Sequence, residues 1–222
     1  MSGRVRAALA AAAAVLLAGC GSTVAGTATW PGATLERAAL AAGDFPPGVQ
    51  YDRLVEQLGH PDNFGSPPSM RSRPEGCANA LTNVIAESAE RGPGSAAKYT
   101  AAYDGARIAM TVLSWNLDMD KLEAAASRCA EFETYFDTRS KGIAITTTEL
   151  PGLSDDALAY RQTMQLMGSA SSVYMAFQNV GRYGVFGIAF PTPDPGIEVK
   201  ASLPQTFLDV FAKQSVKIRQ AT

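Results

Sequence analysis

The stretch SVYMAFQNVGRYGVFGIAF, residues 172–190, decides the class of fold. It contains two largely apolar segments, 172–180 and 183–190, separated by Gly181 and Arg182. Such a short, glycine-containing connection favours a β-hairpin, because antiparallel strands can be joined by a tight turn whereas parallel strands need a long crossover. We therefore expect two antiparallel strands here.

The rest of the chain extends this pattern. Asp104-Gly105 is a strong hairpin signal, and it joins segments with strand character at 96–103 and 106–115. Further strands are expected at 49–55, 142–149 and 157–167, and helices at 34–42, from Pro74, at 121–136 and at 203–219. Because most consecutive strands are joined by short turns, we predict a single α+β domain, an antiparallel sheet with helices packed on one face.

The helix at 121–136 rests on a regular apolar stripe. Its members recur at steps of three and four residues, as expected for one face of a helix: Leu122, Ala125, Cys129, Phe132 and Phe136.

The N-terminus has the features of a secretory signal. Two basic residues, Arg4 and Arg6, precede an apolar run at 7–17, which is about half the ~20 residues needed to span a bilayer. The following Leu17-Ala18-Gly19-Cys20 resembles a bacterial lipobox. This resemblance implies cleavage before Cys20 and a diacylglycerol on its sulfur. An ordinary secretory signal with an unmodified cysteine nearby is the alternative.

These features divide the chain into three parts. We expect a signal peptide at 1–19, a lipidated Cys20 with a flexible tether at 20–33, rich in small and polar residues, and the α+β domain at 34–222. The protein is then held on the extracytoplasmic face of the cell membrane through its lipid, since two or more acyl chains give stable anchoring.

Charge and composition exclude several classes of function. The net charge is −2, and removal of Arg4 and Arg6 with the signal makes the mature chain more acidic. This argues against nucleic-acid binding, which needs a clustered basic surface. The chain has one histidine and no Cys-x-x-Cys motif, so we expect no metal and no cofactor.

Two cysteines remain once Cys20 carries a lipid, namely Cys77 and Cys129. An even number of cysteines in an exported protein favours a disulfide. Two buried free thiols are the alternative.

Several features resemble mycobacterial secreted proteins and lipoproteins related to the PknH-like extracellular sensor domain. They are spread over residues 34–219: Asp44-Phe45-Pro46-Pro47-Gly48, Pro74-Glu75-Gly76-Cys77, the helix carrying Arg128-Cys129, the paired strands from 157 to 190 and the closing helix. The resemblance implies an antiparallel sheet with a cleft, a Cys77–Cys129 bridge and a ligand-sensing or partner-binding role. It carries over neither transmembrane signalling nor any ligand residue, since this chain has no kinase domain.

One set of residues suggests a binding site. Methionine and aromatic side chains gather in the strands between 157 and 190, and together they are able to line an apolar groove: Tyr160, Met164, Tyr174, Phe177, Tyr183 and Phe186. Ordinary sheet core is the alternative role for these residues. His60 has no nucleophile elbow to serve, so it is interpreted as a solvated loop residue. The acidic pairs Asp118/Asp120 and Asp155/Asp156 are interpreted as turn and helix-cap residues.

Three hypotheses for function follow. The first is a non-enzymatic lipoprotein of the cell envelope that binds a small apolar molecule, a lipid or a cell-wall component. The second is a protein-interaction module that regulates another envelope protein. The third is a hydrolase, for which the sequence offers no catalytic motif.

Overall fold

The structure is a computed structural model that describes residues 32–54, 70–87, 94–103, 105–137, 139, 141–166, 168–191 and 203–221. The predicted signal peptide, Cys20, most of the tether and His60 lie outside the described residues.

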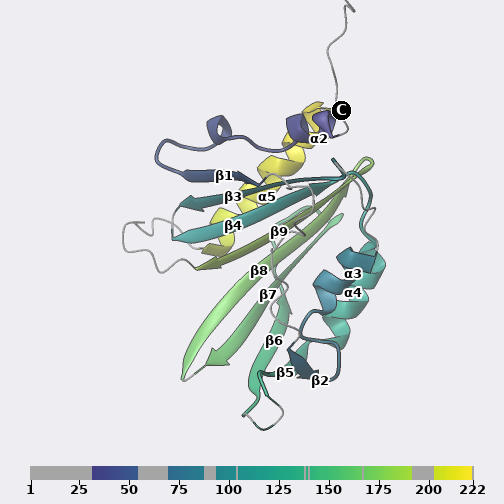
Figure 1. Cartoon of the computed structure of the whole chain (residues 1–222), viewed down its shortest axis with the longest axis vertical. Coiled ribbons are helices and arrows are strands. Elements are labelled where there is room, and N and C mark those ends of the chain that lie inside the picture. The colour runs from purple at the N-terminus through teal and green to yellow at the C-terminus, as the bar shows by residue number, and fades with distance from the viewer. Residues whose placement is uncertain are drawn as a thin grey trace, which may run out of the picture.

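One antiparallel sheet of nine described strands organises the domain (Figure 1). Its order is β1-β3-β4-β9-β8-β7-β6-β5-β2, so β1 and β2 form opposite edges. The strands are β1 (Gln50–Leu54), β2 (Arg71–Arg73), β3 (Ala96–Tyr103), β4 (Ala106–Leu113), β5 (Glu131–Tyr135), β6 (Ile143–Glu149), β7 (Ala157–Leu166), β8 (Ser169–Val180) and β9 (Tyr183–Pro191). The predicted α+β class with a single antiparallel sheet is confirmed.

Both predicted hairpins are present. Val180 is paired with Tyr183 across Gly181 and Arg182, and Gly181 has a φ of 60°. Glycine adopts this left-handed conformation without steric cost, which suits it to the turn. The β3–β4 hairpin pairs Tyr103 with Ala106.

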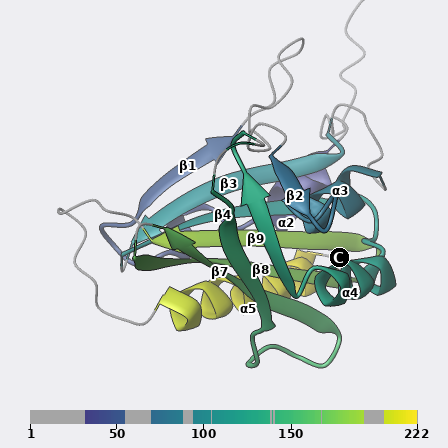
Figure 2. The same cartoon turned by 90° about the horizontal axis from the view of Figure 1, so that it is seen from below.

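The helices lie on both faces of the sheet, so the expectation that they share one face is wrong. The described helices are α2 (Ala33–Ala38), the 3-10 helix η1 (Ala42–Asp44), α3 (Ala80–Glu87), α4 (Met119–Arg128) and α5 (Leu203–Ala221). Helices α2 and α5 pack on strands β3, β4, β8 and β9. Helix α4 packs on β7, and α3 packs on α4 (Figure 1). Figure 2 shows α5 running alongside β8 and β9.

Successive strand residues point to opposite faces, and they join two different apolar clusters. On β8, Ala176 belongs to the cluster beneath α5, whereas Phe177 belongs to the cluster beneath α4. We call these two sides of the sheet the α5 face and the α4 face. A sheet that is apolar on both faces needs a cover on each, which explains why the helices are divided.

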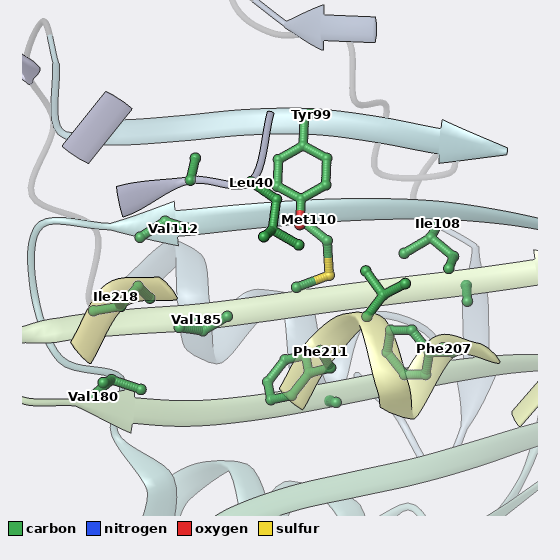
Figure 3. Packing of buried hydrophobic residues seen from close by; sticks show 14 of the residues in the cluster. Leu40, Tyr99, Ile108, Met110, Val112, Val180, Val185, Phe207, Phe211 and Ile218 are labelled. Carbon is green, nitrogen blue, oxygen red and sulfur yellow. The ribbon is translucent and has the colours of Figure 1, made fainter. Parts of the chain in front are cut away.

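The α5 face carries the larger core. Phe207, Phe211 and Ile218 of α5 are fully buried against strands β3, β4, β8 and β9 (Figure 3). Gly187 on β9 allows this close approach, because a Cβ atom built there would lie 2.7 Å from Met110 Sδ and 2.9 Å from Phe207 Cε2.

The predicted helix at 121–136 is wrong in its second half. Helix α4 ends at Arg128 with Cys129 as its C-cap, and residues 131–135 form β5, which pairs with β6. The side chains of β5 alternate between exposed and buried, so Phe132 is buried as a strand residue. The spacing of Phe132 from Cys129 also fits one face of a helix. The sequence pattern alone therefore does not distinguish a longer helix from a helix followed by a strand.

Candidate functional site

The structure divides the predicted aromatic and methionine set between the two faces of the sheet. Tyr174 and Tyr183 belong to the cluster beneath α5 and are buried there. Tyr160, Phe177 and Phe186 belong to the cluster on the α4 face. Met164 is paired with Ile145, a member of that same cluster, and lies on the same face. The six residues therefore do not form one site, and only the α4 face brings four of them together.

An aromatic row crosses three strands on the α4 face. The Tyr160 and Phe177 ring centroids are 6.4 Å apart, and Phe177 stacks on Phe186 at 5.3 Å with an angle of 15° between the planes. Phe177 is 0% exposed and Tyr160 is 7% exposed, whereas Phe186 is half-buried. The row thus leads from core beneath the helices to a less covered part of the sheet.

Burial perturbs the phenol of Tyr160. It raises the pKa of Tyr160 to about 12, and the nearby carboxylates of Glu123 and Glu149 act in the same direction because they disfavour a phenolate. Tyr160 is therefore neutral at physiological pH and contributes a neutral, mostly apolar surface.

Strand β9 marks where the helical cover of the α4 face ends. Along β9 the residues on the α5 face are buried, while Phe186, Ile188 and Phe190 on the other face are half-buried. All three are apolar. Half-buried apolar residues continue on the same face of the neighbouring strands, at Val173 on β8, Met164 on β7 and Ile145 on β6. We call these six residues the β9 strip.

The α5 face of strands β5, β6 and β7 differs from the β9 strip in exposure and polarity. Residues that point to this face are exposed, as at Glu133, Thr146 and Arg161. These side chains are polar or charged. The sheet therefore has a solvated polar area on one face and an incompletely buried apolar area, the β9 strip, on the other. On the α4 face Gln162 pairs with Val173 and Ser171 pairs with Met164, so polar side chains lie among the apolar ones. Several apolar side chains left half-buried on one sheet face are candidates for a binding site.

Cys77 and Cys129 are joined by a disulfide, as the cysteine count and the family resemblance imply. Both residues lie in the α4-face cluster and are almost fully buried. Arg128 donates from Nη1 to the Glu75 carbonyl oxygen at 3.2 Å. Like the disulfide, this hydrogen bond links the turn before α3 to the end of α4.

The predicted helix that begins at Pro74 starts later, at Ala80. Residues 74–79 form a turn instead, because the Ser72 hydroxyl accepts hydrogen bonds from the Cys77 and Ala78 amides at 2.8 and 3.2 Å.

The acidic pairs have structural roles where the structure places them. Asp118 is the N-cap of α4 and accepts from the Lys121 amide at 3.1 Å. Asp156 accepts from Gln178 Nε2 at 2.9 Å, and Gln178 in turn accepts from the Ser215 hydroxyl at 2.6 Å. This network ties the turn before β7 to β8 and α5. In the part of the chain that the structure describes, no group of three or more His, Cys, Asp or Glu residues is arranged to hold a metal ion.

The helical spacing of the last helix places Gln214 on its inward face, and the structure buries it there, but the sequence does not show what its side chain binds. Its side chain contacts three groups from segments more than a hundred residues away, and its place among apolar residues of the last helix is the signal that points to it.

Comparison with known proteins places the chain near few others. No family model matches the sequence, and no curated protein matches it. One matching structure is an uncharacterized protein from Mycobacterium smegmatis, an Rv0999 ortholog, with 17% identity and a TM-score of 0.46 over 80% of this chain and 92% of that chain. Another is the extracellular domain of PknH from Mycobacterium tuberculosis, with 13% identity and a TM-score of 0.36 over 56% of this chain and 64% of that one. At these values neither match carries a function over to this chain.

Among the described helices, none combines the length and the apolar character needed to cross a membrane.

Proposed function

We propose that this protein is a non-enzymatic, lipid-anchored protein of the cell envelope that binds a small apolar molecule, such as a lipid chain, on the β9 strip. The observation that carries the proposal is the row of half-buried apolar residues Phe186, Ile188 and Phe190. Burying such side chains under an apolar ligand is favourable by about 25 cal/mol per Å² of apolar surface removed from water.

The neighbouring side chains suit this kind of ligand. Phe186 stacks against the fully buried Phe177 of the neighbouring strand, which limits its movement at one end of the strip. Val173 and Met164 lie half-buried on the same face, and methionine adapts its shape to an apolar partner. Thr111 and Arg107 lie beside the strip on β4, in register with Phe186 and Phe190, and provide polar groups at its border.

The anchor is the second element of the proposal. Lipid attachment at Cys20 follows from the lipobox, and the buried disulfide suits the oxidising environment outside the cytoplasm. Metabolic labelling with a fatty-acid analogue is expected to tag the protein, and Cys20→Ala is expected to remove the tag. A Cys20→Ala variant that remains labelled and membrane-bound would refute the anchor.

Binding on the strip is tested with a matched pair of variants. Ile188→Ser places a hydroxyl in the β9 strip, and Val216→Ser makes a similar change at an exposed position of α5. The full chain is incubated with a fluorescent fatty acid and with an envelope lipid extract, and thermal melts confirm folding. Ile188→Ser is expected to lose capture while Val216→Ser keeps it. Equal capture by the two folded variants would contradict the proposal.

A protein partner is the second candidate, and one residue favours it. Phe136, just after β5, is 76% exposed, which is unusual for so large an apolar side chain. Phe136→Ser is then expected to abolish chemical cross-linking to an envelope protein without lowering the melting temperature. Unchanged cross-linking would remove this candidate.

A further inference from the structure

Residues 70–87, which include β2 and α3, are attached to the domain at its edge. We call this segment the strap. Strand β2 is one of the two edge strands and pairs with β5 over three residues, Arg71–Arg73. Helix α3 packs on α4, and no described strand is in comparable contact with it.

Few buried apolar side chains hold the strap in place. Cys77, Ala80 and Leu81 are its buried members, and they belong to the α4-face cluster with Leu122 and Phe132. Val84 and Ile85 pack against the same cluster but are only partly buried. Helix α5, by comparison, buries eight residues against the other face. Since hydrophobic stabilisation grows with the apolar area removed from water, the strap is held much more weakly than α5.

The turn of the strap is held by hydrogen bonds within the strap itself. The Ser72 hydroxyl accepts from two amides of the strap's own turn, those of Cys77 and Ala78. Across to the domain, Arg128 donates to the Glu75 carbonyl at 3.2 Å and to Cys77 Sγ at 3.7 Å. The Thr134 hydroxyl donates to the Arg71 carbonyl at 3.3 Å. The turn can therefore persist when the strap moves.

The disulfide is the strap's single covalent fastening other than the chain itself. It joins Cys77 to Cys129 across 52 residues, and a bond that closes so long a loop strongly limits how far its ends can separate. We propose that the strap opens as one unit when this disulfide is reduced, while β3, β4, β8, β9 and α5 stay folded. Such opening uncovers apolar side chains of α4 and β5, including Leu122 and Phe132.

The chemical step is a thiol–disulfide exchange with a dithiol reductant. Its two electrons break the Cys77–Cys129 bond, two protons complete the two thiols, and the reductant becomes a disulfide. Cys77 and Cys129 are 1% and 2% exposed, so a thiolate reaches them only during brief local openings of the strap, and reduction then makes the open state persistent. The rate of reduction therefore reports how often the strap opens. This inference does not depend on the identity of any ligand.

Hydrogen–deuterium exchange with mass spectrometry tests the proposal. The full chain carries Cys20→Ala, so that Cys77 and Cys129 are its only cysteines. Dithiothreitol in native buffer is expected to abolish protection in residues 70–87 and to leave β8 and β9 protected. Simultaneous loss of protection in β8 and β9 would overturn the proposal, as would a reduced protein with a fully protected strap.

Two matched leucine variants separate opening of the strap from unfolding of the whole domain. Leu81 in the strap and Leu208 on α5 are buried to almost the same extent, at 4% and 5% exposed. Leu81→Ala is expected to speed reduction of the disulfide at least about tenfold, because it removes part of the strap's apolar hold. Leu208→Ala is expected to leave the rate unchanged. Equal rates in the two variants, whether fast or slow, would show that reduction needs global unfolding.

Discussion

Gln214 offers the sharpest test of how the N-terminal segment is held. Its side chain on α5 is 0% exposed. The side-chain oxygen accepts from the Leu40 amide at 3.0 Å and from the Tyr99 hydroxyl at 3.1 Å, and the side-chain nitrogen donates to the Ala38 carbonyl at 2.7 Å. The side-chain amide of Gln214 thus bonds the segment after α2 to the last helix, and Leu40 and Gln214 are 174 residues apart in the chain.

Gln214→Met keeps the length and the apolar contacts of the side chain but removes these hydrogen bonds. The Leu40 amide and the Ala38 carbonyl then lose a partner in a site that is closed to solvent. A buried polar group left without a partner costs about 1–3 kcal/mol, so the two groups together cost about 2–6 kcal/mol. That is a large share of the roughly 5–15 kcal/mol by which a typical domain is stable.

Chemical denaturation of the full chain measures this loss, and Tyr99→Phe is the control. Tyr99→Phe removes one donor to Gln214 and leaves both backbone groups paired, so we expect a cost of about 1 kcal/mol. Hydrogen exchange of the Leu40 amide gives a local readout, and its protection should fall in Gln214→Met before that of the sheet. The reasoning is refuted if Gln214→Met costs no more than Tyr99→Phe, or if the Leu40 amide stays protected.

Three further predictions concern packing and titration. Gly187→Val should destabilise the domain by roughly 1–3 kcal/mol in denaturant melts, because its side chain would displace Met110 or Phe207; an unchanged midpoint would contradict the close approach of α5. Partial burial opposes ionisation of Asp44, but the Ala41 amide and Lys217 outweigh it and hold its pKa below 3.8. The stabilisation is therefore complete above pH 3.8 and is lost as pH falls through the lower folded value, so Asp44→Asn should cost stability at neutral pH and little in acid. Tyr160, whose pKa burial raises to about 12 from the ordinary tyrosine value of 10.0, should ionise late in an ultraviolet titration, and Tyr160→Phe should remove this late phase; a titration curve that Tyr160→Phe lowers near pH 10.0 instead would contradict its burial.

Local patterns in the sequence determine much of the fold. The two-residue turn at Gly181-Arg182 and the Asp104-Gly105 signal specify hairpins, because the turn sets the register of the strands that it joins. The antiparallel sheet and the α+β class follow from these local connections. The two cysteines left after Cys20 also indicate the disulfide, since export favours their pairing.

Other elements depend on contacts between distant parts of the chain. The stripe from Leu122 to Phe136 satisfies a helical pattern, yet pairing of β5 with β6 turns its second half into a strand. Tertiary pairing overrides a local preference in this way because each ladder hydrogen bond and each buried side chain counts only once the partner strand is present.

The candidate site shows the same division. Alternation along β8 and β9 tells from sequence alone that Tyr174 and Phe177 point to opposite faces, but not which face is covered. That depends on the pairing of β9 with β4 and on α5 packing against Gly187, contacts between segments far apart in the chain. The sequence by itself therefore determined the two hairpins, their turns and the apolar residues available for binding. The tertiary structure alone decided which of those residues became core and which remained half-buried on the β9 strip, because burial is a property of the packed neighbours and not of the residue.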